Sequence, residues 1–141
     1  MPGPFSPNAQ INTDVAGQLV SGPPGSALNV GFRNIPQNSQ SANYTTVLND
    51  SGWQIYHPTT DASARNYTIA SNAAVPYEIG AAISFFNDLG AGVITIAING
   101  GDTLIFSGVG TTGSRTLPAG CSATAVKVAP TRWMISGPGL T

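Results

Sequence analysis

Charged residues are scarce in this sequence. Lysine and arginine number 5, aspartate and glutamate 6, and together they make up 8% of the 141 residues, against about a quarter in an average soluble domain. The basic residues are scattered, so no stripe of them is present to neutralise a nucleic-acid backbone. So little charge produces weak repulsion between molecules, which suits a protein whose outside is covered by neighbours.

Other absences narrow the class further. The single cysteine, Cys121, excludes an intramolecular disulfide and a multi-cysteine metal site. No apolar run approaches the length of a membrane-spanning helix, and the first residues lack the basic and apolar segments of a secretory signal. We therefore expect no membrane partner and synthesis in the cytoplasm. A chain of this length suits one domain and needs no disulfide or metal to fold.

Short strand patterns separated by turn residues fill the chain from about residue 42 onward. In residues 93–98 the side chains of Ile94, Ile96 and Ile98 share one face, the alternation of a strand with a core side. The turn at residues 99–102 predicts a hairpin with residues 103–106. Together these patterns predict an all-β fold, an antiparallel β-sandwich or jelly-roll-like barrel over residues 42–141. The remaining expected strands lie near residues 44–48, 53–56, 66–69, 79–86, 122–128 and 133–135.

Residues 1–41 differ from the rest and predict an extended N-terminal arm. Prolines are frequent in residues 1–26, and each removes a backbone donor, so we expect extended or turn conformations there. The arm is expected to become ordered against a partner or a neighbouring subunit. A flexible tail, or an arm that folds back on its own domain, stays open as an alternative. The candidate partner-binding residues are its apolar ones, Phe5, Ile11, Val15, Leu19 and Val20.

Motifs that carry chemistry are weak, and we predict no enzyme, no cofactor and no metal site. Residues 108–113 match the Gly-x-Gly-x-x-Gly pattern of dinucleotide-binding motifs. No helix is predicted after them, although that motif requires one, so we expect a loop. His57 has no nucleophile motif beside it and is expected at a strand end or at an interface. Cys121 precedes a strand, where a small buried side chain fits. The acids are spread singly across turns, at Asp14, Asp50, Asp61, Glu78, Asp88 and Asp102.

Aromatic residues are the side chains best able to bind a partner. If exposed together, they would stack on sugars or anchor an interface. Trp53 and Trp133 alternate with apolar residues and are expected in the core. The others are Tyr44, Tyr56, Tyr67 and Tyr77.

A family resemblance follows from several segments of residues 44–141. This stretch resembles a module of structural proteins from tailed bacteriophages, including head decoration and tail-fibre proteins. The segments that carry the resemblance are Tyr44-Thr-Thr-Val-Leu-Asn-Asp-Ser-Gly52, Ser63-Ala-Arg-Asn-Tyr-Thr-Ile69, Val75-Pro-Tyr-Glu-Ile-Gly80, Ile83-Ser-Phe-Phe-Asn87, Gly90-Ala-Gly-Val-Ile-Thr-Ile96 and the ending from Lys127-Val through Trp133-Met-Ile-Ser-Gly137.

The resemblance implies a place in the virion. The chain has no long repetitive shaft, so it is most similar to a capsid decoration, or cement, protein. Such a protein binds the outer capsid surface, stabilises contacts between major capsid proteins, and forms homo-oligomers, with a trimer favoured over a dimer. The alternative is a tail-fibre or head-fibre component that binds the host cell surface, with Tyr56 or Tyr77 contacting a glycan. A hydrolase acting on cell-wall sugar is the third and weakest hypothesis.

Overall fold

The chain is built almost entirely of β-strands. The computed structural model describes residues 11–13, 19–21, 28–29 and 34–141, and within these ranges there is no α-helix. One 3-10 turn lies at Leu48–Asp50. The prediction of an all-β fold is therefore confirmed. From residue 34 onward the strands are β4 (Gln37–Ser39), β5 (Tyr44–Thr45), β6 (Gln54–His57), β7 (Arg65–Ile69), β8 (Ala82–Asn87), β9 (Ile94–Ile98), β10 (Thr103–Phe106), β11 (Arg115–Leu117), β12 (Cys121–Ala129) and β13 (Arg132–Ser136).

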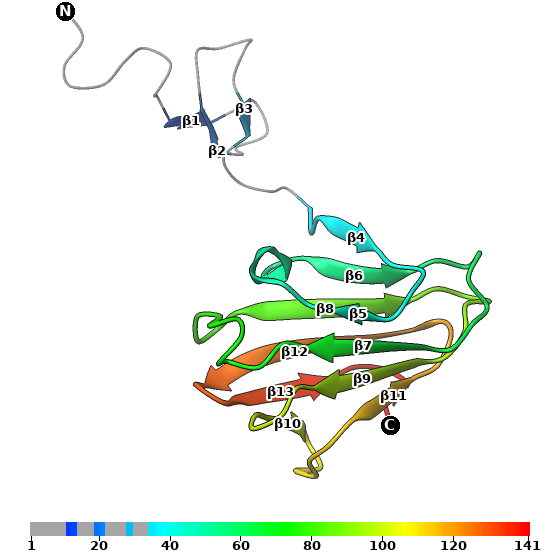
Figure 1. The fold of residues 1–141 in the computed structure, drawn as a ribbon. Helices are drawn as coiled ribbons and strands as arrows, with labels where there is room; N and C mark the ends of the chain where they lie inside the picture. Colours follow the sequence, from blue (N-terminus) through cyan, green and yellow to red (C-terminus); the bar gives the residue numbers. More distant parts are fainter. Residues whose placement is uncertain (1–10, 14–18, 22–27, 30–33) are drawn as a thin grey trace, which may run out of the picture. The chain divides into compact units, whose positions relative to one another are not determined.

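These strands form two sheets, shown in Figure 1. The larger has six strands in the order β10-β13-β12-β8-β6-β4, and the smaller has four in the order β11-β9-β7-β5. From β4 to β9 the chain passes from one sheet to the other at every strand. It therefore returns to each sheet in the same direction, and β4, β6 and β8 are parallel, as are β5, β7 and β9.

Two topological predictions are corrected by this arrangement. Both sheets are mixed, because within them antiparallel strand pairing is confined to β12 with β8 and β13, and to β11 with β9. The predicted hairpin is wrong, because β9 belongs to the four-stranded sheet whereas β10 pairs with β13 in the other. A tight turn does form there, with the amide of Asp102 donating to the carbonyl of Asn99 over 3.4 Å. That turn carries the chain across to the opposite sheet, and turn residues alone do not specify which strand will be the neighbour.

Side chains from both sheets meet in one hydrophobic core. Ile94 and Ile96 are fully buried and Ile98 packs against them, so the predicted core face of β9 is confirmed. Trp133 is 1% exposed, as expected. Trp53 is only partly buried and lies outside the core, so the expectation for it is wrong. The largest buried apolar side chains are Trp133, Tyr67, Phe85, Ile55, Ile69, Ile83, Ile94, Ile96, Leu104, Leu117 and Ile135.

The chain divides into two compact units, at residues 1–35 and 36–141. The first contains a small antiparallel sheet of β1 (Ile11–Thr13), β2 (Leu19–Ser21) and β3 (Leu28–Asn29), in a stretch where the sequence shows no strand periodicity. The candidate arm residues Ile11, Leu19 and Val20 lie in β1 and β2, whereas Phe5 and Val15 lie outside the described residues. The second unit includes β4, although the sequence placed residues 37–39 in the arm.

Candidate functional site

The outer face of the six-stranded sheet carries a row of partly exposed apolar side chains. Strand registers place Ile105 beside Met134, Met134 beside Val126, and Val126 beside Ala82. We call these four residues the apolar row. Val126 and Met134 are each 36% exposed. These side chains alternate with buried core residues along their strands, so the row follows directly from the period of two.

Next to the apolar row runs a ladder of uncharged polar side chains. The Oγ atoms of Ser84 and Thr124 are 2.9 Å apart, and the amide of Gln37 donates to Gln54 over 3.4 Å. Ser136 completes the ladder beside Thr124. Hydrogen bonds between neighbouring strands satisfy part of the bonding capacity of these groups, and none of the groups carries a charge.

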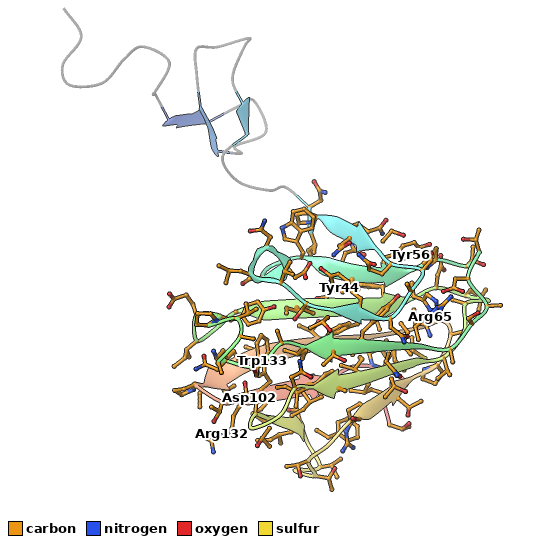
Figure 2. The ribbon with its side chains drawn as sticks, in the orientation of Figure 1. Tyr44, Tyr56, Arg65, Asp102, Arg132 and Trp133 are labelled. Carbon is orange, nitrogen blue, oxygen red and sulfur yellow. The ribbon has the colours of Figure 1, made fainter. Side chains whose placement is uncertain are left out.

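A shallow groove of about 330 Å³ lies at the other end of this face. We call it the end groove. Tyr56 is paired with Phe86 across β6 and β8, and the Tyr56 hydroxyl donates a hydrogen bond to Asp88. That bond raises the pKa of Tyr56 and lowers the pKa of Asp88, so the carboxylate is ionised at neutral pH. Figure 2 labels Tyr56 on β6. The lining residues are Gln37, Gln54, Tyr56, Phe86, Asn87, Asp88, Leu89, Gly120, Cys121 and Ser122.

The outer face of the four-stranded sheet has a different character. Threonine dominates it, and the side chain of Ala97 is the apolar exception among the strand residues of this face that are partly or fully exposed. The two outer faces are therefore unlike, and only the six-stranded one offers exposed large apolar side chains from its strands. The outward residues of the four-stranded sheet are Thr45, Asn66, Thr68, Thr95, Ala97 and Thr116.

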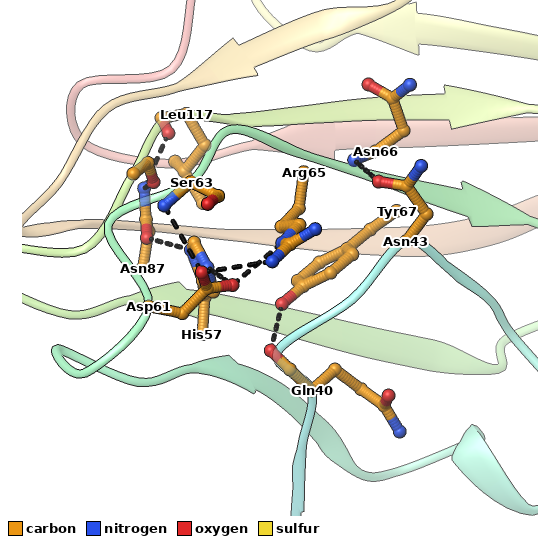
Figure 3. Close-up of polar contacts among 11 residues, drawn as sticks. Gln40, Asn43, His57, Asp61, Ser63, Arg65, Asn66, Tyr67, Asn87 and Leu117 are labelled. Atoms are coloured by element: carbon orange, nitrogen blue, oxygen red, sulfur yellow. Dashed lines mark hydrogen bonds and ion pairs between the residues drawn. The ribbon is translucent and has the colours of Figure 1, made fainter.

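A buried polar network ties the two sheets together near the end groove, as Figure 3 shows. His57, fully buried at the end of β6, lies 2.9 Å from Asn87 through Nδ1 and 2.9 Å from Asp61 through Nε2. Arg65 on β7 donates to both carboxylate oxygens of Asp61, over 2.8 and 3.1 Å. Asn87 donates in turn to the carbonyl of Leu117 over 2.9 Å.

The histidine network has the geometry of a structural element. A catalytic histidine presents one ring nitrogen to a nucleophile and the other to an orienting group. Both ring nitrogens of His57 instead face groups that orient it, Asn87 and Asp61. The predicted position of His57 at a strand end is confirmed. Its burial and its role as a link between β6, β7 and β8 were not predicted.

Two further charged side chains are buried within the domain. Lys127 is 2% exposed, and its ammonium donates over 2.7 Å to both the Asn72 side chain and the Tyr77 carbonyl. Asp50 is 2% exposed and accepts hydrogen bonds from Tyr44 and Asn38 over 2.7 and 3.0 Å. Because these side chains and the Asp61–Arg65 ion pair bond within the domain, few of its already scarce charged groups remain on the surface.

Acidification is expected to destabilise the domain through Asp61. Hydrogen bonds from Arg65 and then from His57 hold the pKa of Asp61 well below its usual range. Because this folded-state pKa lies below the unfolded value near 3.9, the stabilisation is complete above that value and is lost as the pH falls through the folded pKa. We expect the urea midpoint to fall between about pH 5 and about pH 2.

The Asp61→Asn variant provides the comparison. It is expected to be less stable than the wild type at neutral pH and to lose less stability on acidification. Urea denaturation followed by tryptophan fluorescence at each pH measures both effects. An equal loss on acidification in the two proteins would contradict the assignment to Asp61.

The remaining sequence-based candidates are dispersed. Residues 108–113 form part of a loop between β10 and β11, as predicted, with glycines at positive φ. Cys121 is half-buried beside the end groove. Tyr77 is 4% exposed and is therefore not available to a glycan, which corrects that hypothesis, whereas Tyr56 does line the groove. Among the described residues, no group of three or more His, Cys, Asp or Glu is placed to hold a metal ion.

Sequence reasoning missed most of the end groove. Gln37, Gln54 and Phe86 were not singled out, although period-two alternation with Ile55 and Phe85 indicates that Gln54 and Phe86 point outward. No local signal places β4 beside β6, so the contribution of Gln37 had no basis in the sequence. No protein-family model matches the chain, and no curated protein matches it significantly. The described part of the chain also contains no helix suited to spanning a membrane.

Proposed function

We propose that this protein is a non-catalytic structural component of a bacteriophage virion, a decoration protein that binds the outer capsid surface and stabilises contacts between major capsid proteins. We further infer that the two sheets form a β-sandwich and that the first compact unit, residues 1–35, acts as an arm. A sandwich is favoured over a jelly-roll barrel because the two sheets share one core yet include parallel pairs.

The observation that carries the proposal is the difference between the two outer faces. The six-stranded face presents the apolar row, whereas the four-stranded face presents mostly threonine. Apolar side chains grouped on one face with few charged groups, here Asp88 at the end groove and Arg132 on β13, are typical of a surface that packs against protein. The small net charge of -1 also leaves little repulsion between closely packed copies.

Mass action explains how such binding would stabilise a particle. A protein that binds only the assembled lattice shifts the equilibrium toward that lattice. An arm that orders on the capsid would extend the contact across a subunit seam, at a cost in conformational entropy. The proposed arm anchors are Phe5, Ile11, Val15, Leu19 and Val20, and the proposed assembly is a homo-oligomer, a trimer in preference to a dimer.

Val126→Lys is expected to weaken capsid binding at least about tenfold. A loss of about 1.4 kcal/mol in binding free energy is enough to raise the dissociation constant tenfold. The substitution places an ammonium in the middle of the apolar row, and burying it without a partner at an interface is unfavourable. Thr95→Lys is the matched control, since Thr95 also points outward from a strand, β9, but on the other sheet. Co-sedimentation with capsids that lack the protein measures both.

Cryo-electron microscopy of the same particles then locates the chain. Ordered density over the capsid lattice, lost with Val126→Lys and kept with Thr95→Lys, is the expected result. Serine at the five arm positions in the full chain separates the arm's contribution from that of the sheet. Density confined to the tail would overturn the decoration role in favour of a fibre component. Equal binding by the two lysine variants would remove the apolar row from the contact.

A further inference from the structure

We infer that the end groove is a binding site for an uncharged saccharide. This site goes beyond capsid binding, because it lies at the opposite end of the six-stranded face from the apolar row. Ala82 belongs to the apolar row and Phe86 to the groove, and both lie on β8. Four residues of strand separate them, roughly 13 Å. The two sites can therefore be tested separately.

The groove combines the two kinds of group that sugars require. A sugar ring has faces of C–H groups that pack on aromatic rings, and edges of hydroxyl groups that both donate and accept hydrogen bonds. Phe86 is 39% exposed and supplies the aromatic surface beside Tyr56. The side-chain amides of Gln37 and Gln54, which can donate as well as accept, line the same groove.

The arrangement of these groups is organised by the sheet. Tyr56 and Phe86 are register partners on β6 and β8, and Gln37 and Gln54 are register partners on β4 and β6. The Asp88 carboxylate is held by the Tyr56 hydroxyl and by the amide of Leu89, over 2.7 Å to the latter. Bonding to one side chain and one amide leaves acceptor capacity on Asp88 for a sugar hydroxyl.

Charge narrows the class of saccharide. Asp88 is the only ionisable carboxyl or basic group among the lining residues. An anionic sugar would meet this carboxylate without a cation to offset it, so an uncharged ring fits better. Hydrolysis would require a second carboxyl group about 5–10 Å away in the groove, and the lining provides none, so the site binds without cleaving. The volume of about 330 Å³ is at the small end of ligand sites, which suits one or two sugar rings.

Saturation-transfer NMR on the full chain tests the inference. The probes are the methyl glycosides of glucose, galactose, mannose, N-acetylglucosamine and N-acetylgalactosamine, together with lactose, cellobiose and N,N′-diacetylchitobiose. We expect transfer to the ring C–H protons of at least one probe, with a dissociation constant in the millimolar range expected of an open groove. Phe86→Ala and Gln54→Ala should each weaken that binding about tenfold or more. Met134→Ala is the control on the same face.

Each outcome decides the matter. Binding that is lost in Phe86→Ala and Gln54→Ala, and kept in Met134→Ala, supports the site. The absence of transfer to every probe overturns it, as does binding that both groove variants retain. Gln54→Ala removes a partly exposed amide and guards against a variant that fails to fold, with thermal unfolding as the check. Val126→Lys should bind the sugar normally, so failure of the saccharide site and failure of capsid binding are distinguishable.

Discussion

Replacing Trp133 with alanine is expected to lower the free energy of unfolding by about 3–5 kcal/mol, the range for large aromatic side chains in cores. Trp133 is 1% exposed on β13, between β12 and β10. Its ring meets Tyr77 edge to face, with centroids 5.3 Å apart and planes at 87°. Alanine would leave a cavity in the core against β13 and remove that aromatic contact, which adds to the loss.

Met134→Ala is the matched control for Trp133→Ala. The two residues are adjacent on β13, but Met134 points outward and is 36% exposed. Its truncation should change stability by no more than about 1 kcal/mol, since little buried surface is lost. Urea denaturation of both variants, followed by circular dichroism, measures the difference. Similar losses for the two would mean that Trp133 is not a core residue.

His57→Leu is expected to cost about 2–4 kcal/mol although leucine is similar in size and apolar. The imidazole is fully buried and lies between Asn87 and Asp61, at 2.9 Å from each. Leucine would leave the side-chain oxygen of Asn87 buried without this partner, and Asp61 would retain only Arg65 and the amide of Ser63. A buried polar group that loses its partner carries most of its desolvation cost, which outweighs the gain from apolar packing.

Gln54→Leu on the same strand controls for the effect of leucine itself. Gln54 points to the outer face and is partly exposed, where water can replace hydrogen bonds that its amide loses, so we expect a change below about 1 kcal/mol. Thermal and urea unfolding of the two variants give the comparison. A stabilising effect of His57→Leu would show that the network is dispensable for folding.

The His57 network also bears on the saccharide site. Asn87, which His57 orients, is the last residue of β8, and Phe86 and Asp88 flank it on either side. His57→Leu therefore tests positioning as well as stability. Below its unfolding temperature, this variant should bind the saccharide more weakly than the wild type, although His57 does not line the groove. Normal affinity would show that the groove is held by the strand backbone alone.

Local sequence patterns predicted the positions of the strands better than they predicted which strands pair with each other. Strand β10 was predicted with its observed bounds, and β7, β9 and β12 within one residue at each end. Each has a strong alternation or a clear flanking turn, which depends on neighbouring residues only. Strands β4 and β11 were missed, because each is three residues long and mostly polar or exposed. Such strands form only because a longer neighbour supplies hydrogen-bonding groups along its edge.

The scarcity of charge, the all-β class and the inward and outward sides of the main strands could all be read from the residues, because composition and period-two alternation are properties of neighbouring positions. Other features could not be read from the residues. These are the alternation of the chain between two sheets and the parallel pairing of its strands, the burial of His57 and Lys127, and the meeting of Gln37, Tyr56 and Phe86 in one groove. These features depend on contacts between residues far apart in the chain. They arise only when two sheets close over a shared core, which decides which strands become neighbours and which polar groups must find partners inside.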